Sequence, residues 1–270
     1  MNRPELLSSY NYRSDGRRPT EMRSLSLLLS QHPQADGSAT VTHGLTEVMV
    51  TVFGPRESKN KAGLAHDRAV LSVTLDVPVF SGVPGGRRGR SDKRNMEFTS
   101  NIKNTFEPVI QTHLHPRSQI DINIQILQAD GSLLQAAVNA TTLALIDAGV
   151  PMSDYVCATT CALHDSTPLL DLNSLEENDL PNLTVAVLPR SNKVTLVTLE
   201  TQLAVERFEE MLKMAVEAGK LVHREMLRAV QNRSEKLMRA IESVGGGVGG
   251  RPDHRQGEER DVEMYAGNDL

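Results

Sequence analysis

Five cations gather in one short, glycine-rich stretch, SGVPGGRRGRSDKR at residues 81–94: Arg87, Arg88, Arg90, Lys93 and Arg94. Asp92 is the only acid among them. Guanidinium groups bind phosphate oxygens through paired hydrogen bonds, and glycine lets the backbone approach a ligand closely. The stretch also leads into a predicted helix, whose N-terminus adds positive potential. These residues therefore predict a phosphate-binding loop, although a solvated charged loop has the same composition.

A second candidate site is acidic. Residues 165–179 carry five carboxylates and no basic residue, namely Asp165, Asp171, Glu176, Glu177 and Asp179. Clustered carboxylates can hold Mg²⁺ or act as general acid and base. We favour structural roles instead: a turn at Asp165, a cap at a strand end for Asp171, and a solvated loop for the other three. His113 and His115 share a face of an extended segment, but surface histidines are the simpler interpretation, so we expect no metal site.

The amino-acid composition excludes some classes of nucleic-acid-binding, secreted and membrane protein. The net charge is −5, and the chain has 4 Tyr, 5 Phe and no Trp, which argues against a surface that stacks on many bases. A local basic patch stays compatible with these figures, because binding responds to the local field. Cys157 and Cys161 fit two buried thiols in a reducing compartment. With no apolar leader and no apolar run of about 20 residues, we expect an intracellular soluble protein.

The elements that must position these residues follow from hydrophobic periodicity. Residues 38–53 predict a hairpin broken at His43-Gly44, and residues 118–127 alternate strictly, with four isoleucines on one face. Further strands are expected at 68–80, 155–163, 169–172, 183–188 and 193–199, and helices at 96–114, 133–148 and 203–244. Two strand-rich halves that each contain helices predict an α+β fold rather than a doubly wound sheet.

Several long blocks, in order, resemble the RNase PH family. They are RSDGRRPTEMR at 13–23, ADGSATVTHGLTEVMVTVFGPRE at 35–57, RRGRSDKRNMEF at 87–98, PRSQIDINIQILQADGSLLQAAVNATTLALIDAGVPMSDYV at 116–156, and PLLDLNSLEENDLPNLTVAVLP at 168–189. Within the family, the blocks are most similar to the ring subunits of the eukaryotic RNA exosome. The resemblance spans residues 10 to 243 and thus the whole expected domain.

The resemblance implies an RNase PH-like fold (ribosomal protein S5 domain 2-like), with two ββαβ-type units and a long C-terminal helix within residues 1–243. Residues 244–270 are expected to form a disordered, Gly-rich and acidic tail. The implied partners are other RNase PH-like subunits in a hexameric ring, RNA-binding cap subunits, an associated exoribonuclease and single-stranded RNA. Active members of the family degrade RNA from its 3′ end by phosphorolysis. They hold phosphate with a Gly-Ser-Arg motif at a helix N-terminus, and a carboxylate assists.

The chain departs from the family at both of these functional positions. Counted back from the segment 144–149, the arginine falls on Leu134 and the serine on Leu133, while the carboxylate falls on Asn182. Leucine offers phosphate no donor, and asparagine cannot exchange a proton as a carboxylate does. Another acid of the family falls near Glu177. A one-residue shift of the alignment would bring in Asp179, yet the arginine would still be missing. We therefore expect no catalytic residue, metal or cofactor.

The basic loop keeps its match to the family. Lys93 and Arg94 align with two arginines that grip RNA phosphates in the central channel, whereas Arg87, Arg88 and Arg90 lie in a more variable part of the loop. Arg56 and Arg117 are weaker candidates for RNA contact, because arginines that pair with carboxylates of the fold would look the same.

The leading hypothesis is a non-catalytic subunit of the exosome ring that guides single-stranded RNA to a 3′–5′ exoribonuclease. It implies roles in rRNA processing, RNA degradation and mRNA decay, in the nucleus, nucleolus and cytoplasm, and no membrane partner. One alternative is an active, phosphate-dependent 3′–5′ exoribonuclease that places phosphate differently. A stand-alone S5-domain-like binding module is disfavoured, because the resemblance covers the whole domain.

Overall fold

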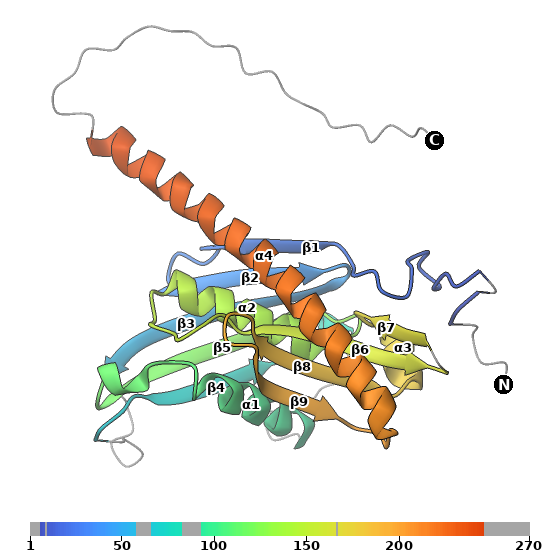
Figure 1. Cartoon of the computed structure of the whole chain (residues 1–270). Helices are drawn as coiled ribbons and strands as arrows, with labels where there is room; N and C mark the ends of the chain where they lie inside the picture. The colour runs from blue at the N-terminus through green and yellow to red at the C-terminus, as the bar shows by residue number, and fades with distance from the viewer. Residues whose placement is uncertain (1–5, 9, 58–65, 83–92, 166, 246–270) are drawn as a thin grey trace, which may run out of the picture. The chain divides into compact units, whose positions relative to one another are not determined.

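The computed structural model describes residues 6–8, 10–57, 66–82, 93–165 and 167–245 (Figure 1). Residues up to Asn232 belong to one compact unit. The described part of a second unit, residues 233–245, is the end of the last helix. Within the described residues, no helix has the length and apolar character needed to cross a membrane.

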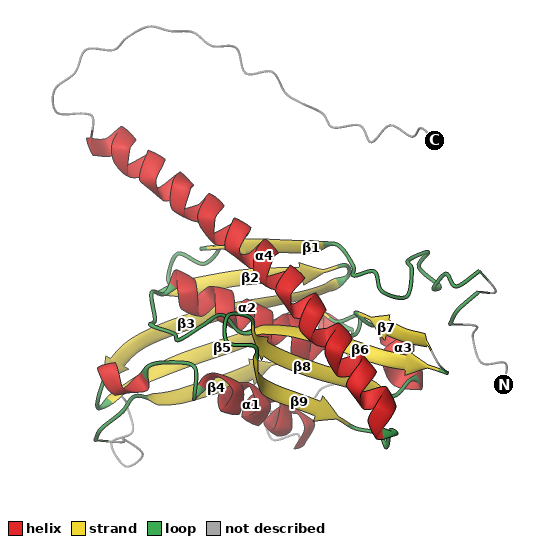
Figure 2. Ribbon diagram, in the orientation of Figure 1, coloured by secondary structure: helices red, strands yellow, loops and turns green. Residues whose placement is uncertain are grey.

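The first sheet has five strands in the order β1-β2-β3-β5-β4 (Figure 2). They span Leu25–Leu29 (β1), Gly37–His43 (β2), Thr46–Glu57 (β3), Val70–Asp76 (β4) and Ser118–Gln128 (β5). Neighbouring strands are antiparallel except β4 and β5, which run parallel. The alternation predicted for β5 is confirmed, since Ile120, Ile122, Ile124 and Ile126 are all buried on one face.

The second sheet is antiparallel and has the order β7-β6-β8-β9. Its strands are Cys157–His164 (β6), Thr167–Leu170 (β7), Asn182–Leu188 (β8) and Lys193–Leu199 (β9). Cys157 and Cys161 are buried free thiols on β6, as expected. Burial raises the pKa of both thiols, that of Cys161 to about 12.

Helix α2, Leu133–Asp147, lies between the sheets and contacts β2 and β3 of the first and β6 and β8 of the second. Its side chains from Gln135 to Leu145 are all buried, which its many small residues allow. Helix α1, Lys93–Phe106, packs near β4 and β9. The short α3 is Ser174–Asp179. Helix α4, Val205–Gly245, covers the second sheet through Met211, Ala215 and Ala218 (Figure 1).

Most predicted elements are confirmed, with three corrections. The helix expected at 96–114 begins at Lys93 and ends at Phe106, because Pro108 follows and removes a backbone donor. The strand expected at 68–80 ends at Asp76, and a 3₁₀ turn, Val79–Ser81, follows it. Strand β1 and helix α3 were not predicted. The expected tail lies outside the described residues from residue 246 onward.

Candidate functional site

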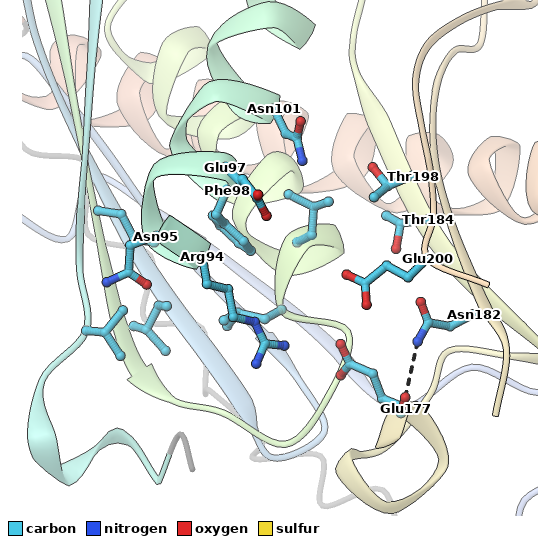
Figure 3. A pocket seen from close by; sticks show the side chains of 15 residues that line it. Arg94, Asn95, Glu97, Phe98, Asn101, Glu177, Asn182, Thr184, Thr198 and Glu200 are labelled. Atoms are coloured by element: carbon cyan, nitrogen blue, oxygen red, sulfur yellow. Dashed lines mark hydrogen bonds between the residues drawn. The ribbon is translucent and has the colours of Figure 1, made fainter. Parts of the chain in front are cut away.

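A cavity of about 130 Å³ lies where the start of α1, the start of α2 and the ends of β8 and β9 meet (Figure 3). Leu134 and Asn182, the two positions predicted to depart from the family, both line it. The structure thus brings together residues that lie 48 positions apart, 182 − 134, in the sequence. The other lining residues that matter for its chemistry are Arg94, Glu97, Leu133, Glu177, Thr184, Thr198 and Glu200.

Hydrogen bonds to Leu172 and Glu177 hold the residue that precedes α2 in place. Ser132, which precedes the helix, has a φ of 51° and is almost completely buried. Its hydroxyl donates to the carbonyl of Leu172 at 2.9 Å and accepts from the N–H of Leu172 at 3.0 Å. Its backbone N–H donates to Oε2 of Glu177 at 2.9 Å. One of the amides that a helix N-terminus would present to an anion therefore already holds a carboxylate of the same chain.

Glu177 is the central carboxylate of the cavity. Burial raises its pKa, and this effect exceeds the opposing effects of the Ser132 N–H and the Arg94 charge, while nearby Glu200 raises the pKa further. Glu177 was expected in a solvated loop, but it belongs to α3 and faces the start of α2. Asn182 secures the same turn, since its side-chain amide donates to the backbone carbonyl of Glu177 at 3.1 Å (Figure 3). An aspartate at position 182 would have no proton for this bond when ionised.

The charges around the cavity are mostly negative. Glu97, Glu177 and Glu200 supply three carboxylates, and Arg94 is the single cation among the described residues that line it. In Figure 3 the Arg94 side chain reaches from α1 toward Glu177. Lys93, the other member of the predicted pair, is exposed at the first position of α1. The remaining predicted RNA-binding residues, Arg87, Arg88 and Arg90, lie outside the described residues.

The acidic segment is tied to the N-terminal arginines. Arg13 and Glu176 form a fully buried ion pair, with Nε of Arg13 donating to Oε1 at 2.7 Å. Arg13 also donates to the carbonyl of Leu170 at 2.6 Å. Glu176 closes a capping box with Asn173 at the start of α3, so the solvated loop expected at this residue is wrong. The sequence contained a signal for α3, since asparagine three residues before glutamate is typical of a helix start.

Asp171 is the second buried acid of this segment. It follows β7, as expected of a residue at a strand end, but its carboxylate binds Arg23 through three hydrogen bonds of 2.7 to 3.0 Å. Burial alone would raise the pKa of Asp171, yet the hydrogen bonds and charge of Arg23 lower it overall. Arg23 also donates to the carbonyl of Asp130 at 2.6 Å, in the turn before α2. The arginines in RSDGRRPTEMR therefore hold the walls of the cavity in place.

The other candidates do not converge on a site. No group of three or more His, Cys, Asp and Glu side chains within the described ranges could hold a metal ion. The side chain of Asp165 is 93% exposed. Arg56 pairs with Asp121 and stacks on the ring of Phe53. These contacts match the alternative that this arginine stabilises the fold by pairing with a carboxylate. Arg117 is exposed and has a φ of 58°.

Comparison with known proteins gives matches along most of the chain. Residues 21–151 match domain 1 of the 3′ exoribonuclease family, known as RNase PH, and residues 154–218 match domain 2. The chain is 39% identical over 241 residues to exosome complex component ski6 of Schizosaccharomyces pombe, covering 89% of this chain and 100% of that protein. It is 41% identical over 229 residues to exosome complex component RRP41 of Homo sapiens, covering 84% of this chain and 94% of the human protein.

A solved structure agrees with these matches. The crystal structure of rice (Oryza sativa) Rrp46 superposes on the chain with a TM-score of 0.73 at 25% sequence identity. The superposition covers 81% of this chain and 100% of the rice chain. Both sheets and the helices between and beside them therefore recur in a known protein.

Proposed function

The chain belongs to the RNase PH family of 3′ exoribonucleases, and from this premise we propose that it is a non-catalytic subunit of the RNA exosome ring. The sequence resemblance and the α+β, RNase PH-like fold are confirmed by the comparisons. Relatives that are about 40% identical along most of the chain are named as exosome components, which supports membership of that assembly.

One observation carries the non-catalytic assignment. At the start of α2, where active relatives are expected to hold phosphate, the Ser132 N–H donates to Glu177 and the next two side chains are leucines. Phosphate would have to displace a bound carboxylate and would gain no donor from the side chains of Leu133 and Leu134. The carboxylate expected of active members is replaced by Asn182, whose side chain is bound to the Glu177 carbonyl.

The electrostatics of the cavity point the same way. Inorganic phosphate carries one or two negative charges near neutral pH, and three glutamates against one arginine would repel it. A phosphorolytic site needs the opposite balance, because its attacking group is an anion. The alternative of an active, phosphate-dependent exoribonuclease would require cations from another chain at this cavity.

We assign the RNA-contact role to Lys93 and Arg94. They occupy the first two positions of α1, where both side chains are exposed and the helix N-terminus adds positive potential. Contacts of this type grip phosphates without reading bases, which suits a channel through which RNA slides. The proposed partners are other RNase PH-like subunits in a hexameric ring, cap RNA-binding subunits, an exoribonuclease and single-stranded RNA. The proposed locations are the nucleus, nucleolus and cytoplasm.

The test measures the products of RNA decay. The assembly that contains this chain is incubated with single-stranded RNA and inorganic phosphate, and nucleotides are separated by chromatography. Phosphorolysis releases nucleoside diphosphates, whereas an associated hydrolytic nuclease releases monophosphates. We expect no diphosphates above background from either the wild-type chain or its Asn182→Ala variant. Phosphate-dependent release of diphosphates that is lost in Asn182→Ala would refute the proposal.

A further inference from the structure

A second, larger hollow of about 730 Å³ lies away from the cavity described above. It is formed by the turn after α2, the segment leading into β6, the turn between β8 and β9, and the middle of α4. We call it the α2–α4 groove. Its apolar floor consists of Ile146, Val150, Met152, Pro189 and Leu227. A hollow of this size and lining is typical of a binding site.

Several acceptors around the α2–α4 groove are already in use. The last carbonyls of α2 accept hydrogen bonds from the N–H groups of Ala148, Gly149 and Val150 at 3.0 Å each. The carboxylate of Asp154 accepts from the N–H groups of Tyr155, at 2.8 Å, and Arg190, at 3.0 Å. The carboxylate of Asp154, which lines the groove, is therefore already engaged by backbone donors.

Two cationic side chains at the groove, in contrast, have no partner among the described residues. The side chains of Lys220 and Arg190 are exposed at the rim, and neither has a hydrogen-bond or ion-pair partner among the described residues. On the same helix, His223 packs edge-on against the ring of Tyr155 at 4.9 Å, and its Nδ1 is buried without a partner within the described part of the chain. The groove thus pairs an apolar floor with unpaired cationic groups.

We propose that the α2–α4 groove binds a segment of a partner protein in which an apolar anchor residue is flanked by acidic residues. The anchor fills the floor between Val150, Met152 and Leu227, and the flanking carboxylates pair with Lys220 and Arg190. Buried apolar anchors supply most of the affinity in such interfaces, and charge complementarity supplies specificity and a faster association. The open shape suits an extended peptide. This site does not depend on the catalytic state of the first cavity.

The experiment selects binders from a random library of twelve-residue peptides against the full chain. A double variant, Lys220→Glu with Arg190→Glu, serves for counter-selection. We expect enriched peptides to carry Phe, Leu, Ile or Trp between aspartates and glutamates. By fluorescence anisotropy, these peptides should bind the double variant at least tenfold more weakly than the wild-type chain. The matched control, Arg207→Glu with Lys213→Glu, makes the same charge change on α4 outside the groove and should bind like the wild-type chain.

Three outcomes overturn the proposal. The first is the absence of any peptide that distinguishes the wild-type chain from the groove variant. The second is enrichment of basic or uncharged peptides. The third is competition by oligoadenylate at equal concentration, which would identify the rim cations as an RNA contact. None of these outcomes bears on the release of nucleoside diphosphates, so failure here is distinguishable from failure of the proposed function.

Discussion

His43 is fully buried at the end of β2, and neither ring nitrogen has a hydrogen-bond partner among the described residues. Burial lowers its pKa from 6.5 to about 4, nearby Asp171 partly opposes the shift, and Arg23 adds to it. A neutral imidazole therefore lies beside the buried pair that Arg23 forms with Asp171. Because the charged form is disfavoured only in the folded state, His43 links stability to pH.

This link gives a prediction for mild acid. The unfolded chain takes up the His43 proton near pH 6.5, and the folded chain does so only near pH 4. Between these values the unfolded state binds more protons, so the free energy of unfolding should fall by about 3 kcal/mol as the pH falls from 6.5 to 4. Urea unfolding at pH 7, 5.5 and 4.5 measures it. His43→Leu, which loses no hydrogen bond, should flatten the dependence.

The exposed His113 provides the comparison. His113→Leu changes an exposed side chain and leaves the buried His43 in place, so this variant should keep the pH dependence of the wild-type chain. An equally steep dependence in His43→Leu would show that the fall in stability arises elsewhere.

At the residue scale, the sequence was sufficient for some assignments and not for others. That Leu134 and Asn182 belong to one site could be predicted from the aligned blocks, and both residues line the cavity; their role as replacements of functional residues stays a prediction. The ion pairs that hold the walls of the cavity could not be predicted, because their partners are far apart in the sequence. Arg13 and Glu176 lie 163 positions apart, and Arg23 and Asp171 lie 148 positions apart. A run of arginines or of acids in a sequence is normally interpreted as a solvent-exposed segment. Nothing in the local sequence indicates that the two runs pair with each other and become buried.

Among the elements, β2 comes close to the C-terminal end of α2 at Gly37. A Cβ at this position would lie 2.3 Å from the backbone nitrogen of Ala148 and 2.4 Å from the carbonyl oxygen of Ala144. Both contacts are with backbone, so the strand or the end of the helix would have to move. The absence of a side chain at Gly37 thus sets how closely the first sheet can approach α2.

Gly37→Ala should therefore lower the free energy of unfolding by about 1–3 kcal/mol, as overpacking does in well-filled cores. Gly219→Ala is the opposite case, because its Cβ would meet no atom closer than 3.8 Å and the residue lies within α4. There alanine should stabilise by about 0.5–1 kcal/mol through its higher helix propensity. Chemical unfolding measures the change in the free energy of unfolding for both variants. A change of the same sign and size in the two variants would contradict the prediction.

The long and strongly periodic elements were predictable, and the short ones were not. Strand β5 alternates over its whole length, and α2 ends at Asp147, two residues before Gly149, whose φ of 70° fits a helix stop. Strand β1, LSLLL, follows a polar segment and has too few residues to show a period. Helix α3 has only six residues, so its capping box was its main signal. Neighbouring elements, rather than local preference, determine such short pieces.

At the scale of the whole molecule, the net charge of −5 hides a division of charge. Acids surround the cavity, and part of the acidic segment is neutralised inside the fold by Arg13 and Arg23. Among the described residues, Arg94, which lines the cavity, and its neighbour Lys93 are exposed cations at the start of α1. The overall charge therefore says little about the surface that RNA would meet.

Reversing this local charge tests the RNA-contact role. Lys93→Glu with Arg94→Glu should weaken protection of single-stranded RNA by the assembled ring, because phosphate contacts dominate such binding. Nuclease footprinting measures the protected length, and size-exclusion chromatography confirms assembly. Arg207→Glu with Lys213→Glu changes the total charge equally and should leave protection unchanged. Equal protection of RNA in both variants would contradict the RNA-contact role and would identify Lys93 and Arg94 as ordinary solvent-exposed charges.

The buried pairs between the N-terminal arginines and the acidic segment also bear on how the chain is made. Arg13 and Arg23 leave the ribosome first, whereas Asp171 and Glu176 follow after about 150 further residues have been translated. Until then Arg13 lacks Glu176 and Arg23 lacks Asp171, so the contacts between the N-terminal segment and the acidic segment cannot form. Contacts of such long sequence separation slow folding and prolong the exposure of apolar surface. The N-terminal arginines therefore gain their buried partners only after the acidic segment has been synthesised.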